Sequence, residues 1–354
     1  MFLRGPALDS SRGSTSLRSS QYAKSAWFDP VKIESSTGRA PSRPAIAASI
    51  AVLVVVWAGN FIAAKIGLLY LPPLAMASFR VVLAGVVMIP LYLSCLRLEA
   101  FVEAAELRRR GFVARDFWTF VYLGFFGVTI NQMCFTIGLH FTSVSHSAVI
   151  VGLSPIYILV LAVLFGLERA TGHKAVGMLM ALAGVAVLAS ENGISRHSAS
   201  IEGDAITMAG SLGFAMYGVL GKRVAGKYDT LTMTAFTHFA GALIVLPLAF
   251  HEGRALYAAG HWQQPWRVWG ALLYMAVFSS ALAYVFYFWL LRYLEASQLS
   301  AFTYLLPVLA TILGIVWLGE KGSWSQVLGA VMSLGGVYWI ESGRAAVVEA
   351  NTVP

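Results

Sequence analysis

The chain has 354 residues, of which 58% are hydrophobic and only 12% are charged, and its mean hydropathy is +0.71. Soluble domains carry about twice that charged fraction, so this chain has too few charges to cover a water-facing surface. The composition therefore excludes an ordinary soluble protein and predicts an integral membrane protein. The net charge of +8 does not indicate nucleic-acid binding, because most Lys and Arg residues lie between apolar segments, as membrane topology requires.

The first 44 residues differ from everything after them. They contain ten Ser, seven Lys or Arg and only three acidic residues. Such a polar segment cannot bury enough apolar surface to fold alone, which predicts a disordered cytoplasmic tail over 1–44. An organellar transit peptide is also Ser/Arg-rich and acid-poor, so it is the alternative, although no amphipathic period is apparent.

Ten apolar segments follow the tail, each near the length of about 20 residues that crosses a bilayer as a helix. Most connections between them are short, and longer ones are expected over 97–116 and 251–267. The sequence thus predicts an all-α fold with ten transmembrane helices. These helices are expected at 45–68, 72–96, 117–139, 147–166, 174–190, 204–220, 231–250, 268–291, 297–318 and 325–340.

The distribution of positive charge predicts how these helices are oriented. With the N-terminus inside, 19 Lys and Arg residues lie on the inner side and four on the outer side. Short loops that face the cytoplasm carry an excess of Lys and Arg, so both termini are expected in the cytoplasm.

The chain also repeats itself, which predicts two five-helix units over 45–190 and 204–341, followed by a cytoplasmic tail over 342–354. Because five is an odd number, the second unit must enter the membrane from the opposite side. Many secondary transporters use such an inverted repeat to build two alternating gates around one site. A shift of 157 residues pairs Lys65 with Lys222, and a shift of 152 pairs Pro155/Pro307, Glu168/Glu320, Gly177/Gly329 and Gly184/Gly336.

Short motifs in the two units follow the order found in a known family. The first two helices carry Trp57-Ala58-Gly59-Asn60-Phe61 with Lys65, and Pro73 before Ser78-Phe79-Arg80; the fourth and ninth carry Leu153-Ser154-Pro155 and Leu306-Pro307. With these motifs the chain resembles the EamA-type branch of the drug/metabolite transporter superfamily over residues 45–341. The resemblance implies ten helices, both ends inside, and transport of small solutes, often efflux of amino acids or related metabolites. It does not fix a substrate, and the long N-terminal tail departs from the family pattern.

Polar side chains within a spanning helix are costly and therefore mark candidate sites. Asn60, with Trp57 one turn earlier on the same face, would hydrogen-bond and stack a substrate. A helix–helix hydrogen bond made by Asn60, with Trp57 as packing, explains the pair equally well. Arg80 lies about eight residues into its helix, near Lys65, which is too deep for a side chain to reach water easily. It is expected to bind either an anionic substrate group or backbone carbonyls.

Two counterpart helices carry the remaining substrate-binding candidates. Asn131 and Gln132 lie in the middle of the third helix, and Tyr284 and Tyr287 lie in the eighth. Because these helices correspond under the shift of 152 residues, their side chains are expected to face one cavity. Each tyrosine, taken alone, is also explained as packing.

Prolines and glycines at counterpart positions suggest how the helices bend and pack. Pro155 and Pro307 are expected near the middle of their helices, where proline removes a backbone hydrogen bond and kinks the helix. They are candidate hinges, with a static kink as the alternative. The paired glycines of the fifth and tenth helices are expected to allow close approach of the two backbones.

No catalytic or metal-ligating motif is apparent, and we expect no enzyme activity, no metal and no cofactor. None of the 17 acidic residues lies in the middle of a span, which argues against proton coupling through an intramembrane carboxylate. His238 in the seventh helix would titrate or, more simply, form a helix–helix hydrogen bond. Cys95 and Cys134 lie in apolar segments and do not indicate a disulfide framework.

These features predict a secondary transporter that exports a small metabolite, an amino acid or a related compound, by alternating access. The alternatives are a flippase for a lipid-linked substrate, a membrane-embedded enzyme, and a receptor or scaffold, which would not need two inverted halves. The expected partners are a small-molecule substrate and the lipid bilayer, without nucleic acid and with a homodimer as one option. The expected location is a bacterial inner membrane.

Overall fold

The computed structural model describes residues 41–97, 116–141, 144–191, 201–225, 227–309, 312 and 323–350. All of them belong to one compact unit, Ile33–Pro354. Over these residues the chain is helical, with short turns and no β-strand. The expected all-α class is confirmed, while residues 1–40 of the tail predicted over 1–44, and Glu320, lie outside the described residues.

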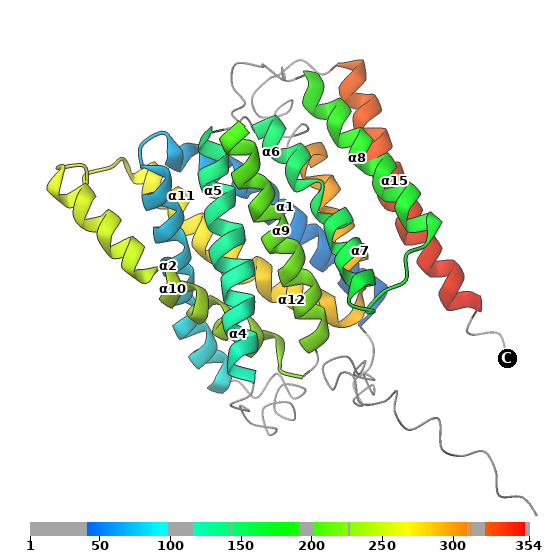
Figure 1. The fold of residues 1–354 in the computed structure, drawn as a ribbon, viewed down its shortest axis with the longest axis horizontal. Coiled ribbons are helices and arrows are strands. Elements are labelled where there is room, and N and C mark those ends of the chain that lie inside the picture. Colours follow the sequence, from blue (N-terminus) through cyan, green and yellow to red (C-terminus); the bar gives the residue numbers. More distant parts are fainter. Residues whose placement is uncertain are drawn as a thin grey trace, which may run out of the picture. The chain divides into compact units, whose positions relative to one another are not determined.

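The helices run roughly along a common direction and its reverse, and helices far apart in the sequence lie side by side (Figure 1). The first half contains α1 (Arg43–Leu68), α2 (Pro73–Arg97), α4 (Phe117–Leu123), η2 (Gly124–Ile130), α5 (Asn131–Phe141), α6 (Val144–Val151), α7 (Ser154–Leu164) and α8 (Gly172–Glu191). The second half contains α9 (Ile201–Val224), α10 (Thr230–Ala258), α11 (Trp266–Tyr274), η3 (Met275–Leu282), α12 (Ala283–Tyr293), α13 (Ala296–Ala301), η4 (Phe302–Tyr304) and α15 (Trp324–Ala350).

Five helices among the described residues are long and apolar enough to cross a membrane, and three shorter apolar helices accompany them. The five are Arg43–Leu68, Pro73–Ser94, Phe117–Phe141, Thr230–Ala258 and Trp266–Tyr293. The count of ten spans stays a prediction. Two boundaries differ from expectation, because α10 continues to Ala258 into the predicted long connection and α15 continues to Ala350 beyond the predicted end at 340.

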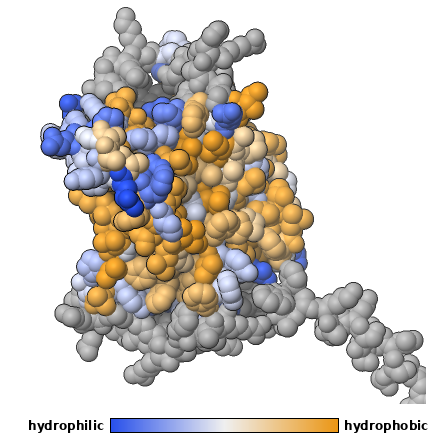
Figure 2. Space-filling view, turned by 60° about the vertical axis from the view of Figure 1, so that its left-hand side comes forward, coloured by the Kyte–Doolittle hydropathy of each residue, from blue (hydrophilic) through white to orange (hydrophobic). Residues whose placement is uncertain are grey.

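Many large apolar side chains of the helices face outward. Leu179, Leu243 and Tyr338 are each at least 60% exposed, although water would not favour such exposure. Apolar residues cover most of the middle of the face drawn in Figure 2, and hydrophilic residues gather toward its upper left. A lipid environment explains this surface, since hydrocarbon solvates it without cost.

The predicted glycine contact between the two halves is confirmed. Helices α8 and α15 pack along each other (Figure 1). A Cβ placed on Gly177 would come within 2.9 Å of the carbonyl oxygen of Gly336, and one on Gly184 would come within 2.6 Å of that of Gly329. The crossed order of these contacts makes the two helices antiparallel, and it leaves no room for side chains between them.

Two helices widen to the π-helical form at corresponding positions. The π-helical segment η2 (Gly124–Ile130) interrupts the helix from Phe117 to Phe141, and η3 (Met275–Leu282) interrupts the helix from Trp266 to Tyr293. The segments correspond under the shift of 152 residues to within one residue. π-Helical turns often mark functional sites, and here each one leads directly into residues predicted to bind substrate.

The two candidate hinges lie at breaks in their helices. The turn at 152–153 separates α6 from α7, so Pro155 is the second residue of α7, where a proline costs little. Pro307 follows the 3-10 segment η4 (Phe302–Tyr304). The helix is thus interrupted just before Pro155, inside the expected span 147–166. Bending at these prolines stays a prediction.

Candidate functional site

A cavity of about 80 Å³ lies between helices of both halves, with room for several water molecules. Its wall combines residues of α1, α2, α5, α9 and α12 with residues near the α6–α7 break and in and after η4. Six of the seven predicted substrate-binding residues line it: Trp57, Asn60, Arg80, Asn131, Gln132 and Tyr284. The structure thus brings together most of the polar residues that the sequence singled out.

Arg80 is the only charged side chain among the described residues that line the cavity. It is 4% exposed. Its Nε donates to Ser280 Oγ at 3.2 Å, and its Nη1 lies 3.5 Å from Thr136 Oγ1. The guanidinium also lies 6.0 Å from the ring centroid of Phe135. No carboxylate of the described part of the chain pairs with it, so its charge is held by hydroxyls and an aromatic face.

The hydroxyl partners of Arg80 belong to a small network around Gln132. Ser280 Oγ donates to Gln132 Oε1 at 2.9 Å, and Thr136 Oγ1 donates to the Gln132 carbonyl at 2.9 Å. The Gln132 Nε2 group is buried and has no hydrogen-bond partner. An unsatisfied buried donor is costly, so the cavity offers a free amide N–H beside a cation.

Asn60 offers a hydrogen-bond acceptor, whereas Gln132 offers a donor. It is buried, and its Oδ1 atom has no hydrogen-bond partner. The alternative of a helix–helix hydrogen bond is therefore not seen at this oxygen. Asn131, by contrast, donates from Nδ2 to the Gly210 carbonyl at 3.1 Å, so part of its amide joins α5 to α9. Of the two asparagines, Asn60 has the free acceptor.

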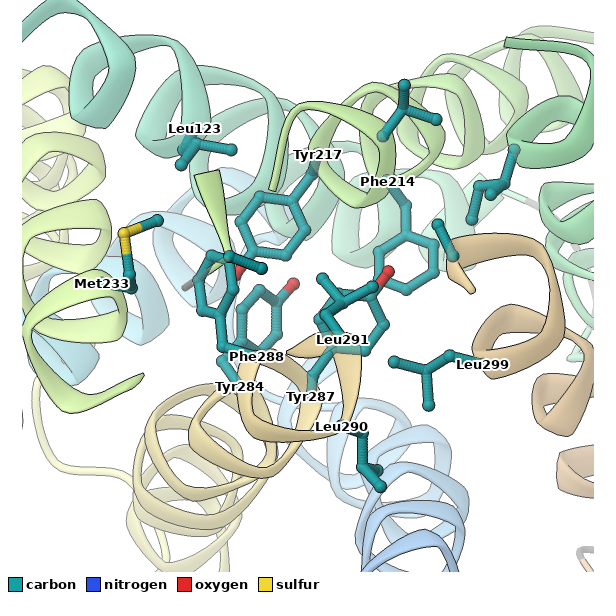
Figure 3. Close-up of a cluster of buried hydrophobic side chains, with 14 of the residues drawn as sticks. Leu123, Phe214, Tyr217, Met233, Tyr284, Tyr287, Phe288, Leu290, Leu291 and Leu299 are labelled. Atoms are coloured by element: carbon teal, nitrogen blue, oxygen red, sulfur yellow. The ribbon is translucent and has the colours of Figure 1, made fainter. Parts of the chain in front are cut away.

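Tyr287 is the one predicted residue that lies outside the cavity lining. Its ring belongs to an aromatic layer behind the cavity, where it packs on Trp57, Phe214 and Tyr217 with centroid distances of 5.9, 5.4 and 5.8 Å. Figure 3 shows Tyr217, Tyr284 and Tyr287 gathered between α9 and α12. The packing interpretation of Tyr287 is favoured, and the layer closes the cavity toward the C-terminal ends of α9 and α12.

An ion-pair latch lies beyond this aromatic layer, between the α7–α8 turn and the start of α13. The Glu168 carboxylate accepts from the Ser297 backbone N–H at 3.1 Å, from the Ser297 hydroxyl, and from Lys174 Nζ at 3.0 Å. Lys174 also pairs with Glu295. Because Glu168 belongs to the first half and Ser297 to the second, the latch ties the halves together at this end.

Two other titratable residues of the spans have local roles. Lys65 donates from Nζ to the Leu139 carbonyl at 3.2 Å, so it caps the end of α5 and does not line the cavity. His238 is fully buried, and its Nδ1 lies 2.8 Å from the Thr234 carbonyl of its own helix. The expected helix–helix hydrogen bond of His238 is not seen among the described residues, because its Nε2 has no partner.

Sequence reasoning missed several small polar residues of the cavity. Ser280 and Thr136 hold Arg80. The rule that singled out Asn60 also covers a serine or threonine in the middle of a span, but hydroxyls often bond to their own helix backbone and so give a weaker signal. The serines and threonines that line the cavity itself are Ser154, Thr207, Ser211 and Thr303.

Known proteins with similar sequences identify the family. The EamA-like transporter family matches residues 45–190 and, a second time, residues 201–342. The chain belongs to the EamA-like transporter family. As a member, it is a multi-pass membrane protein whose role is transport, and transporters of this family are not enzymes. The two matched ranges lie close to the two units expected from the internal repeat.

Relatives of this EamA-like transporter carry transporter names. It is 27% identical over 292 residues to an uncharacterized transporter of Archaeoglobus fulgidus, covering 82% of this chain and 94% of that protein. The uncharacterized transporter YyaM of Bacillus subtilis is 29% identical over 295 residues, with coverage of 83% and 92%. A probable terminal-alkyne amino-acid exporter of Streptantibioticus cattleyicolor is 23% identical over 292 residues, with coverage of 82% and 92%.

A solved crystal structure, among others, shares the fold of the EamA-like chain. The TM-score is 0.64 at 19% sequence identity, and the match covers 84% of this chain and 96% of the other. At this identity the likeness concerns the arrangement of the helices alone.

Proposed function

We propose that the protein is a secondary transporter that exports a small metabolite with an anionic group, such as an amino acid, by alternating access. The substrate binds in the central cavity with its anionic group on Arg80. The protein lies in a bacterial inner membrane with both termini in the cytoplasm, as the positive charges of its loops predict. Its partners are the substrate and the bilayer, with a homodimer as one option.

The observation that carries this proposal is the unpaired guanidinium of Arg80. A buried charge without a counter-charge is costly, and the described residues supply only hydroxyls and a ring. A mobile carboxylate would supply the counter-charge through two parallel hydrogen bonds. The free Gln132 Nε2 would add a third donor, and the free Asn60 Oδ1 would accept from an ammonium or N–H group.

The rest of the cavity wall suits an apolar substrate body. Phe61, Phe135 and Phe214 line it together with the rings of Trp57 and Tyr284. Aromatic rings bind apolar groups over a large area. A small molecule with a charged end and an apolar body fits this division, and the amino-acid exporter name of one relative agrees with it.

Features shared by the two halves support alternating access. The π-helical segments η2 and η3 lie at corresponding positions, and the antiparallel glycine contact of α8 with α15 is the self-complementary kind that a two-fold relation between the halves produces. Inverted halves of this kind rock around a site between them.

Transport into liposomes by the purified protein tests the proposal. A panel of radiolabelled amino acids, nucleosides and organic cations should show uptake of carboxylate-bearing compounds. Arg80→Lys keeps the charge but removes the planar fork, so the apparent KM should rise about tenfold, as expected for a lost charged hydrogen bond. Arg254→Lys is the matched control, because Arg254 is exposed in α10, and it should leave KM unchanged. Transport of organic cations alone, or an unchanged KM in Arg80→Lys, would contradict the proposal.

An apolar groove favours a second candidate, the flippase for a lipid-linked substrate. The groove of about 1040 Å³ lies along α1 and residues 302–312, with Arg43 at one end. Trp57 and Leu306 stand between it and the cavity. A lipid-linked substrate would need this wall to open, so a disulfide between cysteines at Val54 and Leu305 should abolish flipping but leave transport of a water-soluble substrate intact. The metabolite transporter remains first because the cavity is small and Arg80, Gln132 and Asn60 line it.

A further inference from the structure

Each π-helical segment leaves one backbone carbonyl outside the helical hydrogen-bond pattern. A π-helix bonds each N–H to the carbonyl five residues back, and an α-helix bonds it four residues back. Where the α-helix resumes, one carbonyl is passed over, which means that it receives no hydrogen bond from a backbone N–H of the helix. The Asn131 N–H donates to the Phe126 carbonyl at the end of η2, so the carbonyl passed over is that of Gly127. The Ala283 N–H donates to the Phe278 carbonyl at the end of η3, so there it is that of Ser279.

Each of these carbonyls accepts a hydrogen bond from a side chain of the other half of the chain. The Tyr284 hydroxyl lies 3.0 Å from the Gly127 oxygen and 3.0 Å from Asn131 Oδ1, so its single proton is shared between two acceptors of the first half. Trp57 Nε1 donates to the Ser279 oxygen at 3.3 Å. Gly127 and Ser279 are themselves separated by 152 residues in the sequence. We call this reciprocal pair of contacts the cross-brace.

The cross-brace is also part of the cavity wall. Trp57 and Tyr284 both line the cavity, and their ring centroids are 6.3 Å apart at an interplanar angle of 74°. A molecule in the cavity that touches these rings would therefore act on both inter-half hydrogen bonds together. Position 127 must be glycine, because a Cβ there would collide with the ring of Tyr217.

We propose that Trp57 and Tyr284 are positioning residues that link occupancy of the cavity to the relative position of the two halves through the cross-brace. This inference rests on the proposed transport function, and it adds a role that a substrate-contacting ring alone does not have. In the state described here the cross-brace holds the halves together on the side of the aromatic layer. Movement of the halves requires both carbonyls to lose their donors, and a substrate favours that movement by displacing the two rings.

Thiol labelling tests the inference without any need for transport. The background carries Cys95→Ser and Cys134→Ser, and Leu299→Cys serves as the reporter because Leu299 is buried beyond the aromatic layer. Tyr284→Phe keeps the ring and removes the donor, so the reporter in native membranes should react with N-ethylmaleimide about three to ten times faster, as the loss of one ordinary hydrogen bond implies. Trp57→Phe removes the other donor and should act in the same direction, which keeps the test valid if one variant fails to fold.

Tyr217→Phe is the matched control. Tyr217 lies in the same aromatic layer, 5.3 Å from Tyr284 between ring centroids, but its buried hydroxyl has no hydrogen-bond partner. Its removal should leave the labelling rate unchanged. Equal acceleration by Tyr217→Phe and Tyr284→Phe would mean that packing alone controls the reporter, and no acceleration by either donor variant would mean that the cross-brace holds nothing. Both outcomes overturn the inference.

Kinetics with the substrate found in the liposome screen provide a second readout. A positioning role predicts that Tyr284→Phe changes the maximal transport rate several-fold while the apparent KM stays within about twofold, because the ring remains in the cavity. A change confined to KM would make Tyr284 a simple substrate contact. If no substrate of the panel is transported, the proposed function fails, but the labelling result still decides whether the cross-brace exists.

Discussion

In both halves of the molecule a lysine donates to a carbonyl at a helix end, but the two halves carry different charges at their ends. Lys65 in the first half donates to the carbonyl of Leu139, and its counterpart Lys222 donates to the carbonyl of Leu291, which lies 152 residues after Leu139. Each lysine thus satisfies a carbonyl at the C-terminal end of a helix, where the backbone has no partner of its own. This shared hydrogen bond is part of the scaffold, because both halves need it.

The latch has no charged equivalent in the described part of the other half. Lys174 pairs with Glu168 of its own half and with Glu295 of the other half. Its counterpart under the same shift, Gln326, accepts instead from the Ser323 N–H of its own chain segment at 3.1 Å, and the counterpart of Glu295 is Ser143 in the sequence. Repeated features therefore build the scaffold, whereas unrepeated charges distinguish one end of the transporter from the other.

The largest expected effect comes from breaking the latch. Lys174→Gln places the residue of the other half at this position and leaves the buried Glu168 carboxylate without its cation, at a cost of about 3 kcal/mol. The temperature at which the detergent-solubilised protein loses its monodisperse elution peak should fall clearly. Adding Glu168→Gln removes the uncompensated charge and should restore part of the loss. Gln326→Ala is the comparison at the other end, and an equal loss there would mean that the two ends do not differ.

A smaller effect is expected where the halves are most alike. Gly184→Ala places a Cβ within 2.5 Å of the Ser333 backbone nitrogen and 2.6 Å of the Gly329 carbonyl oxygen, so α8 and α15 must separate. Overpacking of this kind costs about 1–3 kcal/mol. The same thermal assay should detect it, with Gly172→Ala as the control because a Cβ there meets no atom within 4 Å. Equal stability of the two variants would contradict the close contact.

The smallest expected effect is the difference in thermal stability between variants of the two lysines. Lys222 donates to two carbonyls, at 2.6 and 2.7 Å, and Lys65 donates to one, at 3.2 Å. Each helix-end hydrogen bond contributes about 1 kcal/mol, so Lys222→Met should lower thermal stability more than Lys65→Met. The reverse order would show that Lys65 has a task beyond capping α5.

Much of the candidate site could be predicted from the sequence, for a physical reason. A polar side chain within an apolar segment is costly and therefore rare, so Asn60, Arg80 and Gln132 stood out without any structure. The repeat placed Gln132 and Tyr284 at corresponding positions, and both line the cavity. The membrane environment, the helical class and the family were also within reach, because they depend on composition, segment length and the order of motifs.

Only the tertiary structure decided which of these residues meet. Tyr284 and Tyr287 are one helical turn apart, yet only Tyr284 lines the cavity. The π-helical segment before α12 sets this choice, since one extra residue in a turn rotates every side chain that follows it, and no sequence pattern announced the segment. The partner of Lys65 was likewise beyond prediction, because a backbone carbonyl has no signature in the sequence. Composition and repeats thus determined what the chain is built from, while the packing of the halves determined which groups remain free for a substrate.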